Sequence, residues 1–198
     1  ANRTMQAKLT ADIDLNNQDW AAYSIGDSGS YAYAGTFDGD GHTVKGYRIY
    51  KNVTKNPSPY VYLGFFGCTS KATIRNLTLE GSVEIDMNGM SGTTKATSGY
   101  VAGLVAEAKG TTIQNVVVDV NISLTNNDSK LGAFTTGGVA ARVSFVSENG
   151  ATTSDPKVIT NSLIENCENR GNVTGGNSAG GIAGRTANCV TVRNCKNS

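Results

Sequence analysis

Asp38 and Asp40 form the sharpest acidic cluster of the chain, in the segment FDGDGH, with His42 two residues further on. Alternating Asp and Gly occur in calcium-binding loops, where closely spaced carboxylates supply oxygen ligands. The same residues are also typical of a tight turn, in which Asp and Gly serve the backbone geometry. The pattern therefore indicates either a turn or a calcium site at Asp38 and Asp40, and a catalytic carboxylate pair is a third interpretation.

Few other residues are spaced for catalysis or metal binding. His42 is the only histidine, so a His-rich zinc site is excluded and a Ser–His–Asp triad would have to use it. The four cysteines show no CxxC spacing. Cys167 and Cys195 are predicted to lie as free thiols on neighbouring strands, because parallel side chains about 4.8 Å apart fit a disulfide poorly. Calcium is the only cofactor that the sequence suggests.

The aromatic residues are concentrated in the first half of the chain. All eight tyrosines lie at or before Tyr100. Aromatic rings offer rigid amphipathic area for a sugar or a protein, but they also pack well in a core or a capping segment. Both interpretations stay open for one set of residues: Trp20, Tyr31, Tyr33, Tyr50 and Tyr60.

Composition limits the class of protein. The chain has 198 residues, a formal net charge of +1, 24 glycines and 3 prolines, which suits a single all-β domain with many tight turns. Lys and Arg are scattered among Asp and Glu, so we expect no nucleic-acid partner. No apolar stretch approaches about 20 residues, so we expect no membrane insertion.

A loose repeat predicts the architecture. Each copy contains a small-residue apolar cluster and then a β-branched residue, a long polar residue and an Asn or Gly. Asn and Gly tolerate the left-handed backbone conformation, so the last position predicts a bend between two short strands. Its members are Gly46, Asn76, Asn115, Asn166 and Asn194. A second column of small residues contains Gly64, Gly103, Gly138 and Gly181.

Recurrence of like residues favours stacked parallel strands over a flat β-sandwich, which gives no reason for it. We predict a right-handed single-stranded parallel β-helix of about five rungs. Residues 1–34 are expected to form an N-terminal capping segment and residues 35–198 the rungs, the last of which is incomplete. Two long loops, 86–99 and 144–161, are where binding residues are expected.

The order of the segments resembles a known family. LTADIDL (residues 9–15), Trp20, GTFDGDGHTVKGYRI (residues 35–49), and then GLVA, GGVA and GGIAG are similar to the GLUG-type repeats of bacterial surface β-helix proteins. Such repeats occur in adhesin-like proteins and in N-terminal regions of immunoglobulin A protease-like surface peptidases. The resemblance implies a secreted or wall-anchored location and a parent chain with further rungs or domains. It implies no catalytic site.

Three functions follow from these patterns. The first is a non-catalytic module that acts in adhesion or as a stalk, with a host protein or glycan as partner. The second is a β-helix carbohydrate-active enzyme or glycan-binding domain, and the enzyme would need two close carboxylates on one wall. The third is an accessory N-terminal domain of a surface peptidase.

Overall fold

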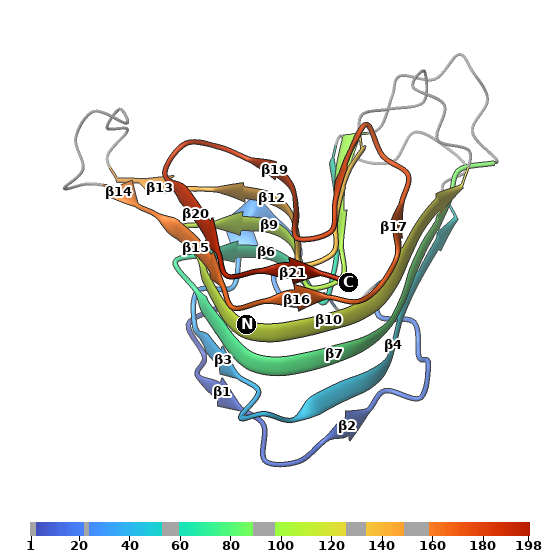
Figure 1. The fold of residues 1–198 in the computed structure, drawn as a ribbon, viewed down its shortest axis with the longest axis horizontal. Helices are drawn as coiled ribbons and strands as arrows, with labels where there is room; N and C mark the ends of the chain where they lie inside the picture. The colour runs from blue at the N-terminus through green and yellow to red at the C-terminus, as the bar shows by residue number, and fades with distance from the viewer. Residues whose placement is uncertain (1–2, 22–23, 53–59, 89–97, 126–133, 149–158) are drawn as a thin grey trace.

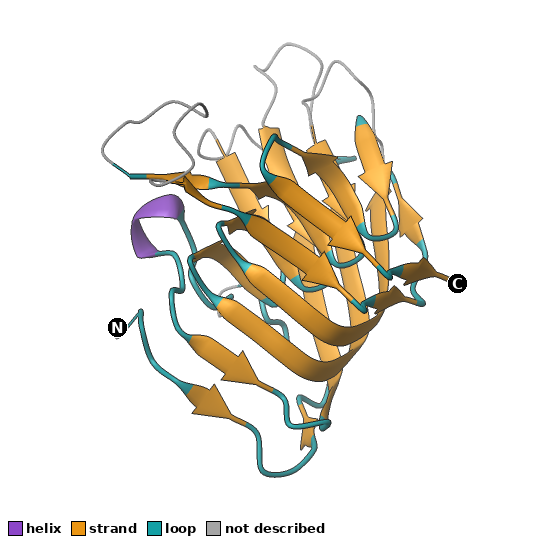
Figure 2. Cartoon of the chain, turned by 60° about the vertical axis from the view of Figure 1, so that its left-hand side comes forward, coloured by secondary structure: helices purple, strands orange, loops and turns teal. Residues whose placement is uncertain are grey.

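The chain is all-β in the part that can be described. The computed structural model describes residues 3–21, 24–52, 60–88, 98–125, 134–148 and 159–198. Within these ranges, strands dominate, and the one helix is the short 3-10 helix η1 (Gly29–Tyr31), shown in purple in Figure 2. No helix of the described residues is long and apolar enough to cross a membrane.

The largest sheet, which we call the main sheet, forms the curved base of the molecule (Figure 1). Every strand pair in it is parallel. Its central order is β1 (Ala7–Lys8), β3 (Thr36–Asp38), β7 (Thr73–Asp86), β10 (Thr112–Thr125), β15 (Ser162–Glu165) and β20 (Val190–Arg193). Five further strands complete it: β2 (Ile13–Asp14), β4 (Thr43–Asn52), β16 (Glu168–Asn169), β17 (Val173–Thr174) and β21 (Lys196–Asn197).

Two smaller parallel sheets lie above the main sheet and diverge from each other (Figure 1). The first, which we call sheet C, contains β5 (Tyr60–Leu63), β8 (Ser98–Ala102), β11 (Phe134–Gly137) and β18 (Ser178–Gly180). The second, sheet B, contains β6 (Phe66–Ser70), β9 (Val105–Lys109), β12 (Ala140–Ser144) and β19 (Ala183–Thr186). The short strands β13 (Val146–Ser147) and β14 (Ile159–Thr160) form a separate antiparallel pair.

The chain visits the three sheets in a constant order. It runs from sheet C to sheet B and then to the main sheet, and each visit pairs in parallel with the previous one. We call one such circuit a pass. Like residues therefore lie above one another, as the repeat predicts, and this arrangement of parallel sheets is compatible with a β-helix.

Apolar columns that cross successive passes form the core. β-branched and aromatic side chains suit these positions because strands alternate between an inward and an outward face. One column pairs Ala7, Phe37, Ile74, Ile113, Ile164 and Val192. Another pairs Ile49, Val83, Ile122 and Val173. In sheet C, Phe134 is buried above Gly99, where a Cβ atom would lie 2.6 Å from the Phe134 ring.

The corner of the main sheet confirms the predicted bend at the four asparagines. Asn76, Asn115 and Asn166 each have φ of +54°, and Asn194 has φ of +53°. Their side chains are also linked, because Asn115 Nδ2 donates to Asn76 Oδ1 (3.1 Å) and Asn166 Nδ2 donates to Asn115 Oδ1 (3.3 Å).

Gly46 does not belong to this corner, contrary to the prediction from the repeat. Its φ is +66°, as expected for a bend. However, Phe37 pairs with Ile74, and Val44 pairs with Leu79. The FDG segment, and not Gly46, therefore lies beside Asn76 in the stack. Gly46 lies instead at a register shift between Val44 and Tyr47. The local motif TVKG resembles the repeat, but the strand pairing places it at this register shift and not at the asparagine corner.

The first 34 residues extend the sheets by strand pairing, in addition to covering the end of the core. β1 pairs in parallel with β3 and β2 with β4. Isolated parallel bridges also join Ile25 to Phe66 and Tyr33 to Thr69. The N-terminal segment thus adds a further layer to the edge of the main sheet and of sheet B, in the same direction as the later passes.

Candidate functional site

The carboxylate of Asp38 lies at the foot of the asparagine corner, with both oxygens engaged. Oδ1 accepts from the Asp40 backbone N–H (2.9 Å) and from Asn76 Nδ2 (3.0 Å), and Oδ2 accepts from Arg75 Nε (2.9 Å). These donors lower the pKa of Asp38, the Asp40 N–H first. Asp40 itself pairs with Lys8 Nζ (2.9 Å) and has φ of +52°. The FDGDGH segment therefore forms a tight turn whose acidic groups are paired with donors of the protein.

His42 pairs with a different acidic residue. Its Nδ1 lies 3.1 Å from Asp12 Oδ1, and that oxygen also accepts from the Thr43 N–H. The Thr43 donor is the first cause of the lowered pKa of Asp12. Among the described residues, no three His, Cys, Asp or Glu side chains gather in a group that could hold a metal. Calcium at Asp38 and Asp40 stays a prediction.

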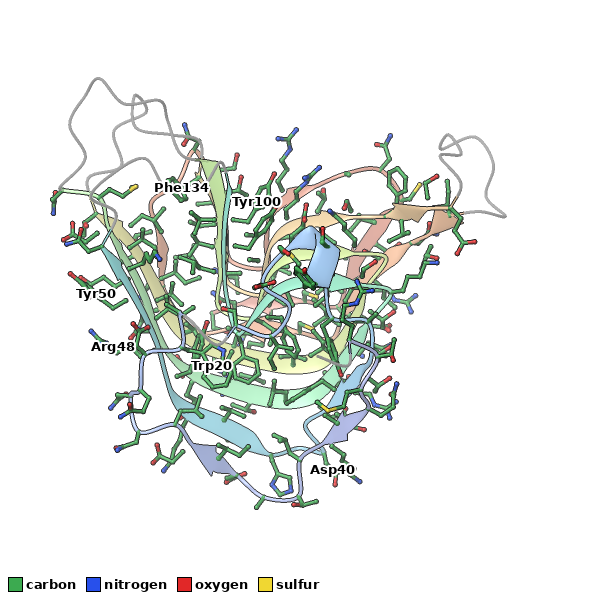
Figure 3. The ribbon with its side chains drawn as sticks, turned by 180° about the vertical axis from the view of Figure 1, so that it is seen from behind. Trp20, Asp40, Arg48, Tyr50, Tyr100 and Phe134 are labelled. Atoms are coloured by element: carbon green, nitrogen blue, oxygen red, sulfur yellow. The ribbon has the colours of Figure 1, made fainter. Side chains whose placement is uncertain are left out.

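Two members of the aromatic set pack into the interior instead of forming a ligand surface. Trp20 stacks on Phe65 with ring centroids 5.2 Å apart, and it points into the concave side of the main sheet in Figure 3. Tyr33 is buried against Phe66, and its hydroxyl donates to the Met5 carbonyl (2.8 Å). Both residues thus pack against the hydrophobic core, as the core or capping interpretation expects.

The remaining aromatic residues of the set are spread over the molecule. Tyr31 is 67% exposed in η1. Tyr50 lies on the outer face of β4 beside Arg48, whose guanidinium carbon is 5.4 Å from the ring centroid (Figure 3). Tyr60 begins β5, and its side chain lies outside the described part of the structure. The described members of the set therefore do not form one surface.

A buried carboxylate, which the sequence did not single out, organises the most unusual polar cluster. Glu107 lies on β9 and its side chain is 1% exposed. Oε1 accepts from Arg142 Nη1 (2.9 Å), and Oε2 lies 2.9 Å from Lys109 Nζ. A buried charge is tolerated only when it is paired in this way. We call Glu107, Arg142, Lys109, Tyr62 and Tyr100 the Glu107 cluster.

Register brings the members of this cluster together from two sheets. In sheet B, Cys68, Glu107, Arg142 and Arg185 are successive members of one column. In sheet C, Tyr62, Tyr100, Thr135 and Ser178 form another. The columns face each other, because Arg142 Nη1 also donates to the Tyr100 hydroxyl (3.2 Å) and its guanidinium carbon lies 5.5 Å from the Tyr100 ring centroid.

Burial and the charge of Glu107 keep Tyr62 and the nearby Cys68 neutral. Burial, followed by the charge of Glu107, raises the pKa of Tyr62 to about 12 and that of the Cys68 thiol to about 12. Neither group is therefore a nucleophile or a base near neutral pH. The cations are the accessible part, with the side chains of Arg142 and Lys109 39% and 38% exposed. The arrangement can bind an anion and donate hydrogen bonds.

Cys167 and Cys195 confirm the prediction of stacked free thiols. All four cysteines are free. Cys167 Sγ donates to the Glu165 carbonyl at 3.2 Å, and Cys195 Sγ donates to the Arg193 carbonyl at the same distance one pass later. Burial raises the pKa of Cys167 to about 12, so this thiol is protonated and inert.

The two long loops that were expected to carry binding residues fall mostly outside the described part. Only residues 86–88 and 98–99 of the first and 144–148 and 159–161 of the second are described.

Comparison with protein-family models, with curated proteins and with solved structures gives no match to this chain. The candidate site is therefore defined by its own geometry, and the Glu107 cluster is the strongest candidate.

Proposed function

We propose that this chain is a non-catalytic module of a secreted or wall-anchored bacterial surface protein, acting in adhesion or as a stalk. In this proposal its fold is a right-handed single-stranded parallel β-helix. Parallel crossover connections are right-handed in nearly all proteins, which supports that hand. The location follows from the resemblance to GLUG-type repeats in the LTADIDL and GGIAG segments.

One observation carries the proposal: a single column of side chains crosses six strands of the main sheet in parallel register, from Ala7 to Val192. Hydrogen bonds along each strand pair and a continuous apolar core join every pass to the next. Such a stack resists bending and shear, because deformation must break many parallel contacts at once. This is the property that a stalk needs.

The last pass has an uncovered edge. Val192 is 42% exposed at the end of its column. Elsewhere in the C-terminal passes, a cavity of about 300 Å³ is lined among others by Val173, Gly181 and Asn197. Stacking a further rung on this edge would cover it.

Mechanical unfolding of single molecules tests the stalk. The chain would be pulled between two identical marker domains, with the force applied across the passes. We expect the chain to unfold at a higher force than the marker domains do. Its extension should increase in steps that each correspond to one or more passes. Gradual extension at low force would overturn the stalk. Incubation with polysaccharide and peptide substrates should give no product, and turnover would overturn the non-catalytic assignment.

A glycan-binding role is the second candidate, favoured by the Glu107 cluster. The cluster holds one buried carboxylate between exposed cations instead of two facing acids. Glycoside hydrolysis generally requires a pair of carboxyl groups about 5 to 9.5 Å apart. The cluster thus fits binding of a glycan better than its hydrolysis.

A further inference from the structure

Charge is unbalanced in the column that runs through the Glu107 cluster. Glu107 pairs with Arg142 directly above it, and Arg185 lies directly above Arg142. Neighbouring strands are about 4.8 Å apart, and like charges placed opposite each other on such strands destabilise the pair. Glu107 offsets Arg142, and Lys109 also binds Glu107, so among the described residues no carboxylate pairs with Arg185.

Arg185 is exposed on β19, and it forms no ion pair with any residue that the structure describes. Arg142 is held in place by Glu107 and the Tyr100 hydroxyl through Nη1 alone. Within the described ranges, its other two nitrogens have no acceptor. The register therefore places two arginines on neighbouring strands of one column, and the guanidinium group of the lower one is fixed by a buried carboxylate.

The side chains of the facing column in sheet C become smaller from the early to the late passes. The column of sheet C changes from Tyr62 and Tyr100 to Thr135 and Ser178. Sheets B and C diverge on the side away from the main sheet (Figure 1), and Tyr100 lies on that side in Figure 3. The register thus places short hydroxyl residues after Tyr100 in this column, where tyrosine rings would occupy more of the space.

We propose that Arg142 and Arg185, together with the Ser178 hydroxyl, bind the acid group and a neighbouring hydroxyl of an acidic saccharide. Guanidinium groups bind carboxylates and sulfates through two parallel N–H donors, which a lysine cannot do. Hydroxyl side chains suit the alcohol groups of a sugar. This inference names the ligand class of the proposed adhesion function and rests on that function for its biological setting.

The nearly neutral chain argues against a general polyanion site. The formal net charge is +1, so a long-range field that would collect nucleic acid is absent. Recognition must come from the local pair of guanidinium groups.

Calorimetric titration of the purified chain tests the inference. The probes are trigalacturonate, its methyl ester as the neutral control, and a sulfated disaccharide as the alternative acid. We expect trigalacturonate or the sulfated sugar to bind, and the ester to bind at least about tenfold more weakly, because it cannot form a charge-assisted pair. Absence of binding by both acids, or equal binding of the ester, would overturn the proposal.

Arg185→Ala is the decisive variant, because this exposed side chain forms no ion pair with a described residue whose loss would disturb the fold. We expect it to weaken binding about tenfold or more. Ser178→Ala should weaken it by a smaller factor. The matched control is Arg48→Ala, which removes an arginine beside a tyrosine on the main sheet and should leave affinity unchanged.

If Arg185→Ala and Arg48→Ala lost equal amounts of affinity for the acidic sugar, the acid would bind any surface arginine. This result would overturn the inference. Arg142→Ala with Glu107→Gln removes both halves of the buried pair and should also abolish binding. Thermal unfolding of each variant shows whether it is folded. None of these substitutions lies in the main-sheet column on which the stalk depends, so the pulling experiment fails or succeeds independently of them.

Discussion

Single residues decide where each pass turns. The corner of the main sheet needs a left-handed backbone, and Asn76, Asn115 and Asn166 supply it while also bonding to one another. Glycine would supply the backbone conformation without the hydrogen bonds, and alanine would supply neither at low cost. The column therefore combines a conformational role with a stacking role.

Replacing Asn115 separates these two roles. Asn115→Ala should lower the free energy of unfolding by about 2 kcal/mol, since it loses two side-chain bonds and places alanine in the left-handed region. Asn115→Gly should lose only about half as much, because glycine adopts that region freely. Urea unfolding of both variants measures the difference. Equal losses would show that the backbone conformation does not matter at this corner.

The four thiols should differ in reactivity. Cys68 and Cys167 are buried, and burial raises both pKa values to about 12. Cys189 and Cys195 are partly exposed. At pH 8 under native conditions, a disulfide reagent should modify Cys189 and Cys195 first, and Cys68 and Cys167 only on unfolding. Cys189→Ser and Cys195→Ser assign the fast phases, and rapid modification of the double variant would contradict the buried column.

Strands contribute stability mainly through their inward columns. β10 contacts β7 along its whole length, and its inward residues Ile113, Val116, Val118 and Ile122 are buried. Its outward residues face solvent, so polarity alternates along the strand. The same alternation in the sequence predicts an inward β-branched residue two positions before each bend. Val44, Ile74, Ile113 and Ile164 are buried as expected, whereas Val192 in the last pass is 42% exposed.

Truncation of a buried side chain of β10 should show this difference. Ile113→Ala should cost about 2–5 kcal/mol, the usual range for a large side chain removed from a packed core. Asp119→Ala, on the exposed face of the same strand, should change stability by less than about 0.5 kcal/mol. Chemical denaturation gives both values. A small effect of Ile113→Ala would mean that the core relaxes around the cavity.

At the scale of the whole molecule, a row of ion pairs lies on the outer face of the main sheet, and we call it the ladder. Arg75 pairs with Asp38, Arg193 with Glu165, and Arg170 with Glu168. Each partner lowers the pKa of its carboxylate, and that of Glu168 falls to about 2, chiefly through Arg170. In Asp38 the Asp40 N–H contributes before Arg75, and in Glu165 Arg193 contributes first.

Stability should therefore fall in acid. A carboxylate with a lowered pKa contributes stability above its unfolded pKa, here 3.8 for Asp and 4.5 for Glu. It loses that stability as the pH falls through the lowered pKa, which is about 2 for Glu168. Unfolding in urea from pH 6 to pH 2 should show a decline that begins below about pH 5. The groups are exposed, so high salt should flatten the curve. Constant stability down to pH 2 would contradict the ladder.

The chain's local pattern was enough to determine that it is all-β, where the corners Asn76, Asn115, Asn166 and Asn194 fall, and which side chains point inward. These features depend on φ preference and on alternation within a few residues. Only the tertiary structure decided that Gly46 leaves the asparagine column, that Trp20 and Tyr33 are packed inside, and that Glu107 meets Arg142 and Tyr100. Those contacts depend on which pass stacks on which, and the pairing of strands separated by tens of residues is set by the packing of the whole molecule.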